Sequence, residues 1–158
     1  MAGVYGRIGG MLVGFDLRAD YADGRITGRM GGPLRGKDLD FAFDGTRLSG
    51  RWGGAFNGKD LHATLENGRL TGRMGGDTFG WDLDLYCDGT VVTGRIGGGV
   101  VGDDFHLSCH EGGRLSGRIG GGFLGKDVDV SVAGLPWLAA AALVAAVYYQ
   151  VYLDRNRN

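Results

Sequence analysis

Lysine, proline and cysteine are scarce in this sequence of 158 residues. There are 2 prolines and 2 cysteines, and lysine occurs only at positions 37, 59 and 126. The formal net charge is −1, which argues against a broad surface for nucleic acid or another polyanion. The start, MAGVYGRIGG, lacks a basic stretch followed by an apolar one, so no secretory signal peptide is expected.

Patterns that carry catalysis or bind metals are also missing. No Gly-rich loop is followed by Lys-Ser or Lys-Thr, as a Walker phosphate loop requires. His62, His106, His110, Cys87 and Cys109 lack the close pairing of a zinc site, and the Gly-Gly…Gly-x-Asp spacing differs from that of the calcium-binding β-roll. No serine stands with a histidine and an acid in a recognisable nucleophile arrangement. We therefore expect no enzyme, no cofactor and no bound metal.

Glycine, by contrast, is abundant, with 34 residues, and it marks an internal repeat. Gly-Arg-x-Gly-Gly occurs six times at steps of 22 residues, with one step of 23, and a Gly-x-Asp-Leu-like element follows each copy. We expect residues 1–132 to form one repeat domain. Its repeated charged residues are Arg7, Asp16, Arg29, Asp38, Arg51, Asp60, Arg73, Asp82, Arg95, Asp104, Arg118 and Asp127.

Each repeat contains two runs in which apolar or Gly residues alternate with Thr, Arg and Asp, which is the pattern of β-strands. Asp-Gly pairs such as Asp44-Gly45 separate the runs and favour tight hairpins. With Asp-Gly as a two-residue turn, Asp38 lies opposite Arg51 and Asp82 lies opposite Arg95. The charges then alternate in sign along one row across the whole sheet.

Because opposite charges stabilise neighbouring strands and like charges do not, this row favours an antiparallel meander. We expect an all-β repeat domain of about twelve short antiparallel strands in a curled meander or roll; a β-solenoid is the alternative. A row without stagger does not produce the shear of a closed barrel, so closure does not follow. Cys87 and Cys109 fall two strands apart, too far for a disulfide, and both thiols should be free.

In period and hairpin content, residues 4–132 resemble the MORN-type repeat, a Gly-rich hairpin repeat of similar length. The resemblance implies a scaffold or a membrane-associated platform. The MORN pattern has Tyr-x-Gly and later Gly-x-Gly elements where this chain has Gly-Arg-x-Gly-Gly and Gly-x-Asp, so no functional residue is carried over.

After Val132 and a linker at 133–134, residues 135–153 read LPWLAAAALVAAVYYQVYL, 19 positions without a charge. At about 1.5 Å per residue they nearly cross a hydrocarbon core of about 30 Å. We expect a single-pass transmembrane helix with a polar tail at 154–158; a buried core helix is the alternative. Its expected anchor residues, aromatic near the ends and small between them, are Trp137, Ala141, Ala142, Ala145, Ala146, Tyr148, Tyr149 and Tyr152.

The connections on the Gly-Gly side of the repeats carry apolar residues, although turns are usually polar. These residues either fold over the core or contact a partner; the candidates are Met11, Leu12, Leu34, Phe56, Phe79, Val100 and Phe123.

Together these features predict a tail-anchored, non-catalytic structural or accessory subunit of a larger membrane protein complex, respiratory or photosynthetic in kind. The expected partners are other subunits and the lipid bilayer, not nucleic acid, and the β domain is expected on the cytosolic side. The alternative is a membrane-displayed binding module for a polymer, glycan or peptide.

Overall fold

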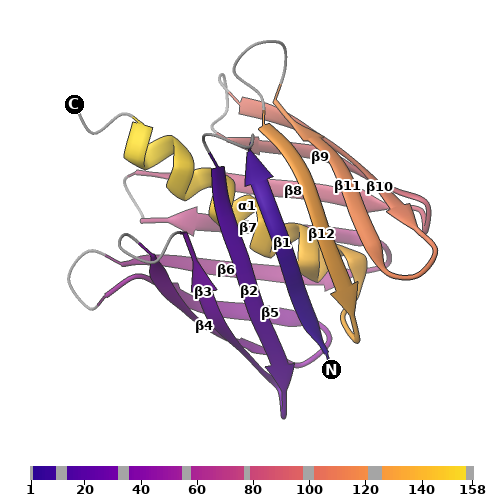
Figure 1. Ribbon diagram of the computed structural model, residues 1–158, viewed down its shortest axis with the longest axis horizontal. Helices are drawn as coiled ribbons and strands as arrows, with labels where there is room; N and C mark the ends of the chain where they lie inside the picture. Colours follow the sequence, from indigo (N-terminus) through magenta and orange to yellow (C-terminus); the bar gives the residue numbers. More distant parts are fainter. Residues whose placement is uncertain are drawn as a thin grey trace.

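In the computed structural model, twelve antiparallel strands form one closed barrel, and a C-terminal helix runs through it (Figure 1). The structure describes residues 2–9, 14–31, 36–54, 58–76, 79–97, 102–120 and 126–155. The elements are β1 (Gly3–Gly9), β2 (Gly14–Ala22), β3 (Arg25–Met30), β4 (Lys37–Phe43), β5 (Arg47–Trp52), β6 (Lys59–Glu66), β7 (Arg69–Gly75), β8 (Gly80–Cys87), β9 (Val91–Gly97), β10 (Gly102–His110), β11 (Arg114–Ile119), β12 (Lys126–Ala133) and α1 (Trp137–Arg155).

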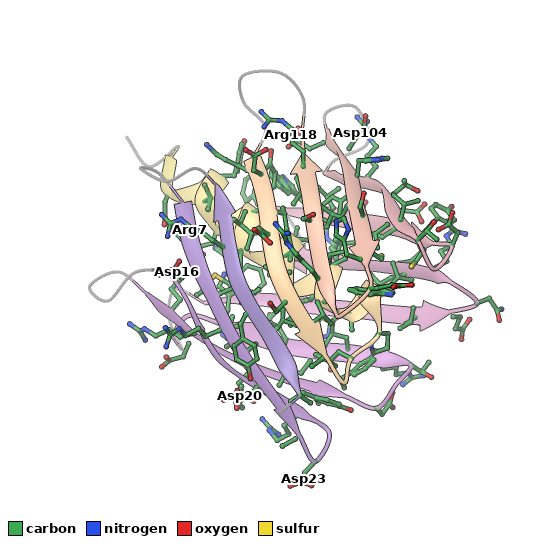
Figure 2. All side chains as sticks on the ribbon, turned by 45° about the vertical axis from the view of Figure 1, so that its right-hand side comes forward. Arg7, Asp16, Asp20, Asp23, Asp104 and Arg118 are labelled. Carbon is green, nitrogen blue, oxygen red and sulfur yellow. The ribbon has the colours of Figure 1, made fainter. Side chains whose placement is uncertain are left out.

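Each strand pairs with the next one along the chain, and β12 pairs with β1 to close the ring. The odd-numbered strands end, and the even-numbered strands begin, at one end of the barrel, which we call the Gly-Gly end. The hairpins that follow the even-numbered strands lie at the other, the Asp-Gly end (Figure 2). The expected antiparallel strands are present, but the sheet is a closed barrel, not an open curled meander and not a solenoid.

The register across the Asp-Gly hairpins differs from the expected one. Arg51 lies opposite Asp40, not Asp38, because Phe43 pairs with Leu48 and four residues form the turn. The Asp44 carboxylate accepts hydrogen bonds from the backbone N–H groups of residues 46 and 47, so the hairpin centre lies one residue later than an Asp-Gly turn would put it. At the other hairpins the pairing is displaced by two residues as well, but through different turns. Asp23-Gly24 and Asn67-Gly68 each form a two-residue turn at positive φ, and Asp88 binds the backbone as Asp44 does. The expected continuous row of alternating charges is therefore wrong.

This shift supplies the shear that a closed barrel requires. Six shifts of two residues, counting the closing β12–β1 pair, give a total stagger of twelve residues for twelve strands. The stagger therefore equals the number of strands. An eight-stranded barrel in which the two are also equal has its strands tilted by about 36°. Twelve strands about 4.8 Å apart at that tilt enclose a circle of about 23 Å diameter. A barrel of this diameter has room for one helix, about 10–12 Å wide, and for one layer of wall side chains around it.

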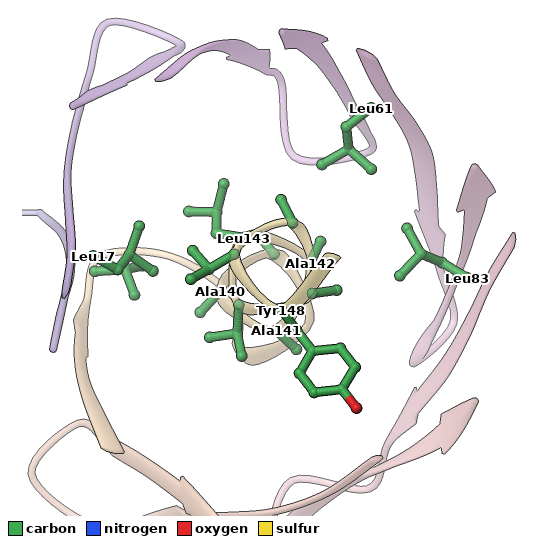
Figure 3. Packing of buried hydrophobic residues seen from close by; sticks show 14 of the residues in the cluster. Leu17, Leu61, Leu83, Ala140, Ala141, Ala142, Leu143 and Tyr148 are labelled. Atoms are coloured by element: carbon green, nitrogen blue, oxygen red, sulfur yellow. The ribbon is translucent and has the colours of Figure 1, made fainter. Parts of the chain in front are cut away.

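Helix α1 occupies this lumen (Figure 3). It is long and apolar enough to cross a membrane, with a mean hydropathy of 1.3 over Trp137–Asp154, but 78% of that segment is buried inside the protein. Leu17, Leu61 and Leu83 point at it from the wall. Of the expected anchor residues, Trp137 is half-buried and Tyr152 is exposed; the others are buried against the barrel, namely Ala141, Ala142, Ala145, Ala146, Tyr148 and Tyr149. In this structure the segment is therefore a buried core helix, which was the alternative to the expected transmembrane helix.

Glycines on the lumen side of the odd-numbered strands allow neighbouring strands to approach closely. A Cβ atom on Gly50 would lie 2.2 Å from the Asp40 carbonyl oxygen and 2.5 Å from the Cα of Phe41. Gly6, Gly28, Gly72, Gly94 and Gly117 show the same approach to the backbone of a neighbouring strand. The repeated glycine is thus required by the strand packing itself.

We predict that Gly50→Ala destabilises the protein by about 1–3 kcal/mol, because the new methyl group overlaps backbone atoms that cannot move aside. Gly54→Ala is the matched control, since a Cβ there meets nothing within 4 Å. Urea unfolding of both variants checks this. Equal stability of the two would contradict the close approach.

We also predict that a chain ending at residue 134 does not fold cooperatively, because its barrel lacks the helix that fills the lumen. It should bind a hydrophobic dye and melt without a sharp transition, whereas a chain ending at residue 155 should melt like the full protein. A cooperative melt of the shorter chain would show instead that the helix is separable from the β domain, as a free membrane anchor would be.

Candidate functional site

The repeated Arg and Asp residues form ion pairs across each Gly-Gly hairpin, as expected. The distances between the guanidinium nitrogen and the carboxylate oxygen are 2.7–3.2 Å, and the side chains remain 40–80% exposed. The pairs are Arg7–Asp16, Arg29–Asp38, Arg51–Asp60, Arg73–Asp82, Arg95–Asp104 and Arg118–Asp127. They lie on the outer wall; Figure 2 labels both members of the Arg7–Asp16 pair and one member of each of two others, Asp104 and Arg118. Such exposed pairs contribute modestly to stability and fix the register between strands.

A second set of ion pairs joins the wall diagonally and was missed by the sequence analysis. Arg69 donates two hydrogen bonds of 2.9 Å to Asp84, and Arg114 binds Asp129 in the same way. Arg25 pairs with Asp40 at the equivalent position. These pairs recur in every second repeat. The alternation of Arg and Asp between odd and even repeats was therefore the feature of the sequence that could have predicted them.

The mouth of the barrel at the Gly-Gly end is less regular than the wall. The residue before each repeated Asp lies on the lumen-facing side of its strand, two positions before a buried residue. These six residues, which we call the mouth ring, are Phe15, Lys37, Lys59, Trp81, Asp103 and Lys126, all half-buried. The three lysines of the chain are therefore all in this ring, and none of them forms an ion pair within the described residues.

The C-terminal half of α1 meets the mouth ring through polar and aromatic contacts. The Tyr148 hydroxyl donates to the Asp103 carboxylate at 2.9 Å. The Trp81 ring lies 4.7 Å from that of Tyr149 and 4.8 Å from that of Tyr152, between ring centres. The helix C-terminus also carries partial negative charge, which suits a ring of lysines.

One buried polar side chain on the helix is fully paired. Gln150 accepts a hydrogen bond of 2.9 Å from the indole N–H of Trp52 and donates one of 2.9 Å to Asp154. A buried amide costs free energy unless both its groups are bonded, so these contacts set the depth and rotation of the helix in the barrel.

Exposed aromatic residues mark two places on the surface. Phe79 is 83% exposed and Tyr152 is 46% exposed. Both lie at the Gly-Gly end, where Tyr152 packs against Trp81 and Phe79 precedes β8. Tyr86, also 46% exposed, lies instead near the Asp-Gly end of β8, with the Arg69 guanidinium 5.2 Å from its ring centre. Of the apolar connection residues expected to contact a partner, Phe79 is exposed; Met11, Leu12, Leu34, Phe56, Val100 and Phe123 lie outside the described residues.

Next to Tyr86 the outer wall is hollowed over a volume of about 380 Å³. Its lining combines a ring face, hydroxyls, an amide and charged groups: Thr64, Glu66, Asn67, Arg69, Thr71 and Tyr86. Thr64 and Thr71 lie directly opposite each other on β6 and β7.

The cysteines and histidines do not converge on a site. Cys87 and Cys109 are free thiols, as predicted. Burial, and secondarily the Cys87 thiol, raises the pKa of Cys109 to about 12, so this thiol stays protonated at neutral pH. His62 and His106 are exposed on the wall, and His110 bonds Ser116 at 2.9 Å. Within the described parts of the chain, no three His, Cys, Asp or Glu side chains are grouped as metal ligands.

The diagonal pairs should make stability depend on pH. Hydrogen bonds from Arg69 and Arg114 hold the pKa values of Asp84 and Asp129 below their usual range. Because the folded pKa is depressed, the stabilisation is complete above the unfolded pKa of about 4 and is lost as pH falls through the folded pKa.

We predict that the double variant Asp84→Asn, Asp129→Asn melts about 2–6 °C lower than the parent at pH 7, and that this difference vanishes near pH 2–3. The double variant Glu66→Gln, Glu111→Gln, which also removes two exposed acids, is the control for net charge. Melting curves between pH 2 and 7 provide the measurement; a constant difference across that range would contradict the assigned pairs.

Comparison of the chain with protein-family models, curated proteins and solved structures finds no match.

Proposed function

We propose that the protein is a non-catalytic accessory subunit of a larger membrane assembly, in which the barrel is a rigid module that docks through its Gly-Gly end. The observation that carries the proposal is the mouth of the barrel, where exposed Phe79 and Tyr152 lie at the same end as the lysines of the mouth ring. Large exposed apolar side chains and unpaired charge are typical of surfaces that contact a partner. The MORN-like hairpin repeat supports the same scaffold role.

The filled lumen supports a structural role as well. Wide β-barrels commonly enclose a ligand cavity or a channel, and here the chain's own helix occupies that space. We propose an energy-transducing assembly, respiratory or photosynthetic, with the barrel on its cytosolic side.

The test is affinity capture of the full-length protein from its native membranes in mild detergent, followed by sizing and mass spectrometry. We expect partners in fixed stoichiometry, and their loss in Phe79→Asp but not in Tyr86→Asp, because Tyr86 lies near the opposite end of the barrel. A single species of 16.7 kDa without partners would refute the proposal.

A tail anchor is the competing form of membrane attachment, favoured by the length and hydropathy of α1. It requires the helix to leave the lumen, which would expose wall residues such as Leu17, Leu61 and Leu83 to water. We therefore propose attachment through the end of the barrel.

A second candidate function, the binding of a glycan, is favoured by the hollow beside Tyr86. An aromatic face beside hydroxyl, amide and carboxylate groups suits a ligand with apolar and polar faces. None of the five equivalent positions in the other repeats has an aromatic residue: Asp20, Ala42, Thr64, Ser108 and Ser131. A glycan array should show binding that Tyr86→Ala abolishes and Phe79→Asp retains. Equal signals from these variants would contradict it.

A further inference from the structure

We propose that the Gly-Gly end of the barrel binds an anionic lipid surface directly. This inference rests on the proposed membrane role and names the partner of the same surface. Three observations carry it: the aromatic side chains exposed there, the placement of all three lysines, and the contrast with the paired charges of the wall.

The aromatic side chains form a short series from buried to fully exposed. Tyr149 is 4% exposed, Trp81 is half-buried against it, Tyr152 is 46% exposed and Phe79 is 83% exposed. Trp81 packs against both Tyr149 and Tyr152, so the exposed Tyr152 ring is held to the barrel, and Phe79 lies two residues before Trp81 along the chain. Trp and Tyr with an apolar body and a polar tip are the residues preferred at the level of lipid headgroups.

The lysines add positive charge at the same end. Lys37, Lys59 and Lys126 belong to the mouth ring, at the starts of β4, β6 and β12, where their half-buried stems leave the ammonium groups able to reach outward. The acid in the ring, Asp103, already accepts a hydrogen bond from Tyr148.

The contrast with the wall selects the lipid surface as the occupant. On the wall, arginines face aspartates at 2.7–3.2 Å and neutralise each other. The mouth instead combines exposed aromatics with lysines that form no ion pair within the described residues, over a face about 23 Å across. Such a combination binds anionic headgroups by charge and the interface by burial of rings. A protein partner at the same face is the competing occupant, and the experiment separates the two.

The test uses the purified full-length protein alone with vesicles of phosphatidylcholine, with or without phosphatidylserine. We expect flotation only with the anionic vesicles, weakened by salt. Phe79→Asp should abolish binding, whereas Tyr86→Asp should leave it unchanged. Lys37→Gln with Lys59→Gln should weaken binding about 25-fold, at about fivefold for each basic residue. The matched control, Arg18→Gln with Arg47→Gln on the wall, should bind like the parent.

A second measurement distinguishes surface binding from insertion of the helix. The chain has 3 tryptophans, so variants that keep only Trp81 or only Trp137 can be made with phenylalanine at the other two positions. Brominated lipids should quench Trp81, at the mouth, and not Trp137, at the start of α1. Quenching of Trp137 would overturn the proposal in favour of helix insertion.

Absence of binding to anionic vesicles would overturn direct lipid binding, and so would equal binding by the lysine and arginine double variants. If the protein fails to bind vesicles but is captured with stoichiometric membrane subunits, the accessory role stands and a protein occupies the mouth. Melting curves of each variant show whether it is folded.

Discussion

A stagger of two residues where each even-numbered strand meets its next neighbour, β12 with β1 included, is the constraint on which the rest of this structure depends. It turns a repeat that would otherwise line up as a flat row into a ring whose last strand meets its first in register. Because the stagger recurs in every repeat, equivalent residues lie at equal heights around one axis. Strand number and stagger together set the diameter, and the diameter admits one helix with a single layer of wall side chains around it.

The strands, their two faces and the ion pairs across the Gly-Gly hairpins could be predicted from the sequence, because alternation and spacing determine them directly. The register at the Asp-Gly hairpins could not. A slip of one residue would turn every side chain to the wrong face, but a slip of two keeps each apolar residue inside, so hydrophobic pattern does not distinguish the two registers. The deciding contacts are local to each turn: the Asp44 carboxylate binds two backbone N–H groups and moves that hairpin centre, whereas Asp23 and Asn67 adopt the positive φ of a two-residue turn. Closure of the barrel depends on these turn geometries together.

For the C-terminal helix, the sequence could not predict the surroundings, for a different reason. A helix surrounded by lipid and a helix surrounded by an apolar barrel wall need the same composition, since both are apolar on all sides. Length and hydropathy therefore could not separate the two, and the barrel had to be known first. The one clue in the sequence is Gln150, an amide that needs a partner in either environment and finds the Trp52 indole on the wall.

In a repeat protein, residues that every repeat shares are explained by the fold they share, so departures from the pattern are the more informative positions. The repeated Arg, Asp and Gly residues all have a structural role in the wall: they form ion pairs, fix the register and allow strands to approach closely.

The mouth ring occupies equivalent positions in all six repeats, yet it carries lysine, aspartate and two kinds of aromatic residue. Strand packing tolerates all of these, and therefore requires none of them. Two of the six, Trp81 and Asp103, are accounted for by contacts with α1. The lysines have no such contact among the described residues and lie at the same end as the exposed aromatics, which is why function is to be sought at this end.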